Sequence, residues 1–409
     1  MQTYRELFRV PGFTPLFTAT GVQIAAGTVE GLALGTLVYE STGSPLLSAV
    51  SMFGASFSQV AGATLLMSAA DRLRPRAVLT AAPLLFGGGA LLLAVPGLPV
   101  WATLLVILGT GLVTSVTGGL RWGLLLRMLP EGGYVLGRSV FAMASGLTQI
   151  GGFAVGGLLI AFASARGALL ISAALFAFSA LVTRLGLADR PPAGTGRASV
   201  RETWRVNRHL MSCPARRSLY VALWVPNGLI VGCEALFVPY APDAAGVLFV
   251  AAALGMLIGD AAMGRFVPAA WRPRLITPLR LLLAVPFLLF ALPAALRLPL
   301  PLAAAAALIA CTGYSASLLL QEQLIARTPG HVRGQALGLQ SAGTMTMQAV
   351  GATLAGAVAQ WLPPGAAMGV MAAASLLVSL ALTPALVRLA RTPPTPGRAR
   401  SSADSRPAS

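Results

Sequence analysis

The 409-residue sequence predicts an all-α membrane protein with twelve transmembrane helices in two pseudo-symmetric six-helix bundles. Three observations predict this fold class. Hydrophobic residues make up 56% of the chain and charged residues 10%, with a mean hydropathy of +0.78, values not expected of a water-soluble chain of this length. Apolar stretches of about 20 residues, enough to cross a hydrocarbon core of about 30 Å, recur along the chain. The two halves of the sequence also resemble each other.

Each predicted span is an apolar stretch that must fold as a helix, because lipid offers its backbone groups no hydrogen-bond partner. The ends are placed to within about three residues. The expected spans are 13–38, 45–69, 77–95, 99–123, 138–161, 165–187, 217–240, 245–266, 275–296, 299–322, 334–360 and 365–388.

The longest break divides these spans six and six. The expected organisation is an N-terminal bundle at 1–187, a cytoplasmic linker at 188–216, a C-terminal bundle at 217–390 and a disordered cytoplasmic tail at 391–409. Within the linker, 200–210 is expected to form a short surface helix. The first residues do not look like a removable signal peptide, so we expect the first span itself to target the membrane.

The basic residues predict the orientation. All 29 are arginines, and with the N-terminus inside only Arg166 and Arg297 fall on the outer side. We therefore expect a multi-pass protein of the plasma (inner) membrane with both termini cytoplasmic. The net charge of +17 does not indicate a nucleic-acid partner. A nucleic-acid-binding protein gathers its basic residues on one soluble face, whereas these arginines are distributed between apolar stretches.

Residue patterns typical of soluble enzymes are missing from the sequence. The two histidines, His209 and His331, have no metal-ligand spacing or evident triad partner. The three cysteines, Cys213, Cys233 and Cys311, are far apart. A phosphate-binding loop of the GxxxxGKS type needs a lysine, and the chain has none. We expect no enzymatic activity, cofactor, metal site or ATP-driven transport.

The internal repeat rests on four landmarks in the same order. Gln23 and Glu30 match Asn227 and Glu234, the turn RPR at 74–76 matches 272–274, the segment from Tyr134 matches that from His331, and Gln149 and Gly152 match Gln348 and Gly351. Six-helix halves in the same orientation are related by an axis along the membrane normal. This arrangement leaves a cavity between the bundles near mid-membrane.

Two carboxylates, Glu30 and Glu234, lie inside predicted spans at matching positions. A charge there costs at least about 2.5–3.5 kcal/mol, so such residues usually face water, a partner or a proton path. Each lies seven residues after an amide, Gln23 or Asn227, and therefore on the same helix face. We interpret all four as proton-coupling or substrate-cavity residues. The alternatives are hydrogen bonding between helices and, for Glu234, wetting from outside.

The loop MSAADRLRPR at 67–76 resembles the GxxxDRxGRR signature of the major facilitator superfamily, in which Asp71, Arg72 and Arg76 match. Met67, Arg74 and Pro75 depart from it. The resemblance in architecture covers about residues 5–390. It implies the major facilitator fold, with the first and seventh helices lining the cavity.

Two further segments resemble the exporters of this superfamily. GGFAVGG at 151–157 is similar to the GPxxGG element of its antiporters, with Phe153 in place of the proline. FRVPGFTPLFTATGVQ and the following TGSP look like the multidrug and macrolide exporter branch. The resemblance implies export of a hydrophobic or amphipathic small molecule in exchange for protons. It also implies a monomer embedded in the lipid bilayer. The alternatives are uptake of a nutrient by proton symport, or a non-transporting membrane sensor or assembly protein.

Small residues every four positions allow close helix packing in lipid. We expect this role, rather than one in proton exchange, for five glycines. They are Gly152, Gly156, Gly157, Gly351 and Gly356.

Charged residues near the inner helix ends are candidates for a cytoplasmic gate. Asp71, with Arg72 and Arg76, would latch onto the free amides at the start of the eleventh span, and the alternative is a solvated turn. A gate salt bridge is expected for Asp260. Arg121 and Glu322 are expected to be a charge pair that forms or breaks with the inner mouth of the cavity.

Overall fold

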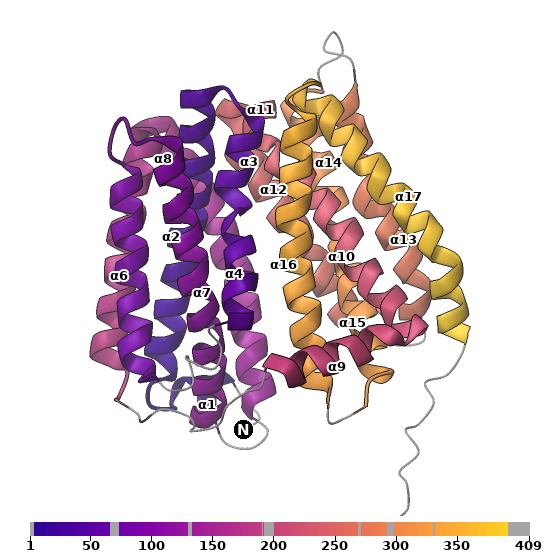
Figure 1. The fold of residues 1–409 in the computed structure, drawn as a ribbon, viewed down its shortest axis with the longest axis horizontal. Coiled ribbons are helices and arrows are strands. Elements are labelled where there is room, and N and C mark those ends of the chain that lie inside the picture. The colour runs from indigo at the N-terminus through magenta and orange to yellow at the C-terminus, as the bar shows by residue number, and fades with distance from the viewer. Residues whose placement is uncertain are drawn as a thin grey trace, which may run out of the picture.

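The structure is a computed structural model that describes residues 4–65, 73–129, 133–189, 191, 200–268, 271–292, 298–329 and 332–391. Every regular element within these ranges is a helix. Figure 1 shows the helices of the N-terminal half and those of the C-terminal half as two groups side by side. Helices α1 and α9 lie at one end of the molecule and α11 at the other, and these are called the α9 end and the α11 end below (Figure 1).

The N-terminal group follows the expected order of spans. Its helices are α1 (Tyr4–Phe8), α2 (Phe13–Thr42), α3 (Pro45–Phe53), α4 (Ala55–Leu65), α6 (Pro75–Leu93), α7 (Val100–Met128) and α8 (Gly133–Gly186). Helix α8 is two helices merged across Ser164, whose φ of 71° is not helical. The Ser164 hydroxyl accepts a hydrogen bond from the amide of Gly167 at 3.3 Å, as an N-cap residue does. The predicted break between 161 and 165 is therefore confirmed.

The TGSP turn shows how local sequence ends one helix and starts the next. Gly43 has a φ of 63°, a conformation that glycine adopts without strain, and its amide donates to the carbonyl of Tyr39 at 2.8 Å. The side chain of Ser44 then caps α3 by accepting from the amide of Leu47 at 3.3 Å. Pro45 follows at the first helical position, where its missing N–H is not needed.

The C-terminal group begins after α9 (Val200–Ser212), which confirms the expected helix in the linker. Its elements are α10 (Pro214–Ala235), α11 (Phe237–Tyr240), η1 (Pro242–Ala244), α12 (Ala245–Arg265), α13 (Arg272–Ala284), η2 (Val285–Ala291), α14 (Leu300–Thr312), η4 (Gly313–Ser315), α15 (Ala316–Ala326), α16 (Arg333–Val358) and α17 (Pro364–Arg391). The expected tenth span is thus α14, η4 and α15 in succession.

Nine segments of the described residues are long and apolar enough to cross a membrane. One of them, Met143–Gly186, covers both parts of α8. Helices α3 and α4 are not among these segments, because a turn at Gly54 separates them and each alone is too short to cross a membrane. Helix α16 is long enough but is not among them either, since its Gln, Ser and Thr residues lower its hydropathy. The all-α membrane fold is confirmed, and the count of twelve spans stays a prediction.

Serine hydroxyls link the last helix of each half to its first. In the N-terminal half, Ser172 and Ser179 of α8 donate to the carbonyls of Ala26 and Ala19 in α2, at 2.7 and 2.8 Å. In the C-terminal half, Ser375 of α17 donates to the carbonyl of Pro226 in α10 at 3.2 Å. The two halves therefore use the same kind of interhelical bond, as the sequence repeat suggests.

Candidate functional site

Glycines allow the closest helix crossings inside each half. A Cβ on Gly152 of α8 would lie 2.9 Å from the Cβ of Thr28 in α2. In the matching crossing of α16 with α10, a Cβ on Gly351 would overlap the carbonyl oxygen of Gly228. A Cβ on Gly156 would lie 3.4 Å from the Cα of Val29, which is ordinary contact. These distances are of the kind that the packing hypothesis requires.

Two other glycines pack between the halves instead of within them. A Cβ on Gly157 of α8 would lie 3.2 Å from the Cα of Gly246 at the start of α12. A Cβ on Gly356 of α16 would lie 2.7 Å from the Cα of Leu46 in α3. Gly157 and Gly356 hold matching positions in the sequence repeat, so each half contributes one close contact to the interface.

Further contacts between the halves lie toward the same α11 end. The rings of Phe153 and Phe249 are stacked with centroids 4.7 Å apart. The side-chain amide of Gln360 donates to the hydroxyl of Ser44 at 2.6 Å. Ala49, Ala235 and Ala352 form a small buried cluster. Together these contacts join the two halves tightly at the α11 end.

Glu234 is buried inside the C-terminal half, with only 6% of its surface exposed. Its Oε1 atom accepts hydrogen bonds from the Tyr314 hydroxyl at 3.0 Å and from the Cys311 thiol at 3.5 Å. Both donors belong to the α14–η4 segment of the same half. Glu234 is therefore not wetted from outside in this conformation, and its partners lie in its own bundle.

The Tyr314 hydroxyl is expected to stabilise this buried carboxyl group. Tyr314→Phe should lower the free energy of unfolding by about 1 kcal/mol, because one hydrogen bond to a buried group is lost. Tyr39→Phe is the control, since the half-buried Tyr39 hydroxyl has no hydrogen-bond partner among the described residues. Thermal unfolding of both purified variants checks the difference, and equal melting temperatures would contradict it.

Glu30 lies on α2 in different surroundings. Its side chain is half-buried and makes no hydrogen bond or ion pair with any described residue. Along α2, Thr14, Thr18 and Gly27 are exposed, whereas residues 32–36 are all buried. Glu30 therefore lies where the exposed part of this helix ends. The two glutamates match in sequence but not in environment.

The amides predicted beside the glutamates both form bonds between helices. Gln23 Oε1 accepts from Nη2 of Arg121 in α7 at 2.8 Å. Asn227 Nδ2 donates to the hydroxyl of Ser317 in α15 at 2.8 Å. These contacts correspond to the interhelical alternative for Gln23 and Asn227. A cavity role for either residue stays a prediction.

The expected charge pair of Arg121 with Glu322 is not formed in this conformation. Arg121 is bonded to Gln23, and Glu322 forms a salt bridge with Arg272 at 3.4 Å. The sequence placed both residues near inner helix ends but could not show which neighbouring helix each side chain faces. Asp260 is exposed and makes no ion pair with any described residue, so the gate salt bridge expected for it is also not formed here.

The basic turn before α6 contacts the end of α8. Arg76 Nη2 donates to the carbonyl of Arg184 at 2.5 Å, and Arg74 forms an exposed salt bridge with Asp189 at 3.3 Å. A basic side chain favours the end of a helix, where carbonyls are free. Asp71 and Arg72 lie outside the described residues, so the latch expected for them stays a prediction.

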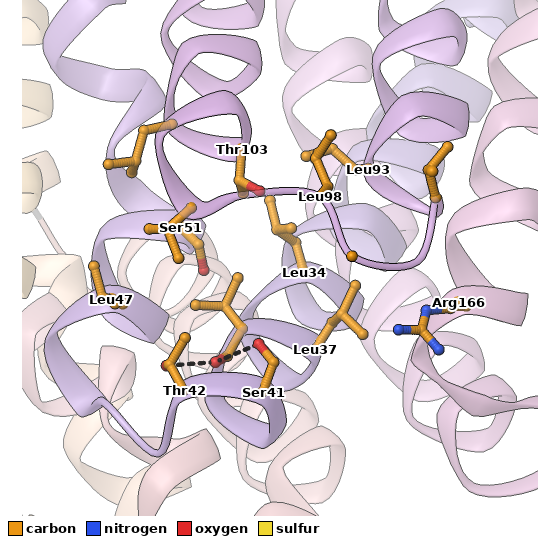
Figure 2. Close-up of a pocket in the computed structure, with 15 residues that line it drawn as sticks. Leu34, Leu37, Ser41, Thr42, Leu47, Ser51, Leu93, Leu98, Thr103 and Arg166 are labelled. Carbon is orange, nitrogen blue, oxygen red and sulfur yellow. Dashed lines mark hydrogen bonds between the residues drawn. The ribbon is translucent and has the colours of Figure 1, made fainter.

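A cavity of about 130 Å³ lies inside the N-terminal half at the α11 end (Figure 2). Its walls are mainly leucine and valine side chains from α2, α3 and the ends of α6 and α7, with Arg166 at its edge (Figure 2). The hydroxyls of Ser41 and Thr42 on its lining donate to the carbonyl of Val38. This cavity lies within one bundle, so it is not the one predicted between the bundles.

Sequence reasoning missed three polar residues of the C-terminal half. Cys311 and Tyr314 lie in the short polar segment CTGYS of an otherwise apolar span, and that interruption was the available signal. Arg280 was grouped with the cytoplasmic arginines, although it lies inside the predicted span 275–296. In the structure only 2% of its surface is exposed.

Comparisons with known proteins show the fold. No family model and no curated protein matches the chain. Among solved structures, a peptide transporter POT in complex with sulfate is similar with a TM-score of 0.71 and 17% identity over 94% of this chain and 96% of that one. The nucleoside transporter NupG has a TM-score of 0.69 and 15% identity over 92% and 99%.

A bacterial homologue of the human lysosomal transporter Spinster, solved in an inward-facing and unoccupied conformation, is also similar. Its TM-score is 0.66, with 14% identity over 96% of both chains. The TM-scores establish a shared architecture. The sequence identities are too low to show a shared activity. The chain is an all-α membrane protein with the major facilitator fold.

Proposed function

We propose that the chain is a secondary transporter that works by alternating access and exports a hydrophobic or amphipathic small molecule in exchange for protons. The observation that carries this proposal is the uneven accessibility of α2. Toward the α9 end this helix has the exposed residues Thr14, Thr18 and Gly27, whereas residues 32–36, just beyond Glu30, are buried. Polar residues that are exposed inside a membrane favour contact with water over contact with lipid.

Helix α10 supports the same interpretation from the other half. Its residues from 226 onward are buried, as are those of α11 through 239. The first and seventh spans are therefore both buried toward the α11 end, where Gly157, Gly356 and Gln360 also join the halves. The arginine distribution favours the α9 end as the cytoplasmic side. The conformation would then be closed to the outside.

Proton coupling is the role proposed for Glu30, and in second place for Glu234. Glu30 has no hydrogen-bond partner among the described residues and lies between the partly exposed residues 14–27 and the buried residues 32–36 of α2. A carboxyl group in that position would exchange protons with the α9 side in this conformation. Glu234, bonded to Tyr314, would need a change in the C-terminal half before it exchanged a proton.

The structural likeness supports transport as the class of activity. The similar chains are described as transporters, for peptides in one case and for nucleosides in another. Export, as opposed to uptake, rests on the resemblance of 151–157 to the antiporter element. The substrate class rests on the resemblance to the multidrug and macrolide branch.

Transport in inside-out vesicles tests the proposal. Vesicles with an acidic interior should accumulate at least one member of a panel of fluorescent lipophilic cations and dyes, and vesicles without the protein should not. Proton symport predicts the opposite flow, since the same gradient would empty preloaded vesicles. A sensor or assembly protein predicts no flow in either direction and copurification with a second protein.

Bridging the closed end should stop the transport cycle. We expect Ser44→Cys and Gln360→Cys, joined by a short bis-methanethiosulfonate linker, to reduce dye accumulation to the level of empty vesicles, because the halves can no longer separate there. A reductant should restore accumulation. Each single cysteine variant with the same reagent is the control, in a background where Cys213 is serine. Full transport by the bridged protein would contradict alternating access at this interface.

A further inference from the structure

Arg280 interrupts the buried face of α13. The buried side chains of this face include Ile276, Arg280, Leu283 and Ala284, spaced so that they share one side of the helix. Ile276 belongs to a hydrophobic cluster that also contains Leu219, Leu320 and Leu386. Leu283 and Ala284 belong to a second cluster toward the α11 end. Arg280 therefore lies at the boundary between the two clusters.

The neighbouring helices carry polar residues at the same boundary. On α10, Leu223 belongs to the first cluster and Leu229 to the second, and Asn227 lies between them. In the same way, Ser317 lies between Tyr314 and Leu319, and Ser379 lies between Leu376 and Leu382. The polar layer consists of Arg280, Asn227, Ser317 and Ser379.

Hydrogen bonding within the polar layer is incomplete. Asn227 is bonded to Ser317 at 2.8 Å. The Nε, Nη1 and Nη2 atoms of Arg280 and the Oγ atom of Ser379 are buried and have no hydrogen-bond partner among the described residues. Only 2% of Arg280 and 1% of Ser379 is exposed. The layer therefore contains a set of unused donors directed into the interior of the C-terminal bundle.

A guanidinium group in this position remains charged, because arginine does not lose its proton in proteins. An unpaired buried charge costs several kcal/mol, and water alone does not neutralise it. Arg280 makes no ion pair with any described carboxylate. The missing partner must accept hydrogen bonds and carry negative charge.

Arg216 shows that the chain can satisfy a buried arginine with its own atoms. It is 8% exposed, and its Nε and Nη2 atoms donate to the carbonyls of Leu210 and His209, each at 3.2 Å. These bonds lie at the α9 end, where carbonyls of α9 are free. Arg280, by contrast, donates to no acceptor among the described residues, so a bound anion is a fitting source of acceptors.

We propose that Arg280 binds a small inorganic monovalent anion, of the size of chloride, inside the C-terminal bundle, with the Ser379 hydroxyl as a second donor. The ion is monovalent because the guanidinium group of Arg280 carries one positive charge. A halide ion only accepts hydrogen bonds, and Arg280 and Ser379 supply the donors. The anion would be a structural ligand of this half and separate from the transported substrate.

Chloride titration of the purified full-length protein tests this site. The protein is exchanged into sodium gluconate, and chloride or bromide is added at constant ionic strength. We expect a saturable rise in the melting temperature, since a ligand that binds only the folded state stabilises it. Equilibrium binding of ³⁶Cl should saturate at one ion per chain. A wild-type protein that shows neither effect overturns the proposal.

Matched variants locate the site. Arg280→Gln removes the charge and should abolish both ³⁶Cl binding and the chloride effect, whereas Arg216→Gln should lower the melting temperature and keep the chloride response. If Arg280→Gln fails to fold, Ser379→Ala decides, because it should raise the half-saturating chloride concentration about tenfold. Ser375→Ala removes a hydroxyl that already has a partner and should leave that concentration unchanged. An unchanged chloride response in folded Arg280→Gln, or in Ser379→Ala where Arg280→Gln does not fold, would refute the site.

Discussion

Glu30→Gln is expected to abolish proton-driven dye accumulation in inside-out vesicles, to the level of vesicles without the protein. Glutamine has nearly the same shape as glutamate and cannot release a proton. Glu30 is a half-buried glutamate just before the buried residues 32–36 of α2, and it has no hydrogen-bond partner among the described residues. Its loss should therefore remove coupling while the fold is retained.

Two variants make this result specific. Glu40→Gln changes an exposed carboxylate at the end of the same helix and should transport like the wild type. Glu234→Gln should reduce coupling as well, with an added loss of stability because the carboxyl group that accepts from Tyr314 and Cys311 is changed. Equal protein amounts and monodisperse elution establish that transport, and not folding, is compared. Wild-type accumulation by both Glu30→Gln and Glu234→Gln would rule out coupling through these residues.

Gly351→Ala is expected to destabilise the protein by about 3 kcal/mol or more, because the added methyl group would overlap the carbonyl oxygen of Gly228. The atom that the methyl group would meet belongs to the backbone of α10, so a change of side-chain rotamer cannot relieve the overlap. The two helices would have to move apart. The melting temperature and the yield of monodisperse protein measure the effect. Gly351→Val should give no folded protein.

Gly338→Ala on the same helix is the control for this overlap. A Cβ at Gly338 meets no atom within 4 Å. Alanine also has the higher helix propensity, by about 1 kcal/mol, so this variant should be as stable as the wild type or more stable. If Gly351→Ala were equally stable, α10 and α16 would not cross as closely as the structure shows.

Much of the fold follows from local properties of the sequence. The helix breaks at Gly43 and Ser164 and the helix at 200–212 fall where turn residues and apolar stretches predict them. The turn at Gly54 inside the second span was not predicted, since a single glycine between Phe53 and Ala55 is not by itself a signal that ends a helix. Gly157 and Gly356, which the offset of the repeat places at matching positions, each make a close contact with the other half.

The candidate site was harder to predict. Arg121 and Glu322 looked like partners by position, but their bonds to Gln23 and Arg272 depend on which helix each side chain faces. For Arg76, predicted as a gate residue, the sequence did not reveal its bond to the carbonyl of Arg184 at the end of α8. Contacts between distant segments depend on helix rotation and crossing, which periodicity within one helix does not reveal.

The sequence by itself determined that this protein is a helical membrane protein with repeated halves and polar residues inside its spans, because hydropathy, turn residues and spacing act over a few helical turns. Only the tertiary structure decided how those polar residues differ. It left Glu30 half-buried and unbonded among the described residues, bonded Glu234 to Tyr314, and buried Arg280 without a hydrogen-bond partner in the part of the chain that the structure describes. The physical reason is that burial and hydrogen bonding depend on neighbouring helices, which come from remote parts of the chain.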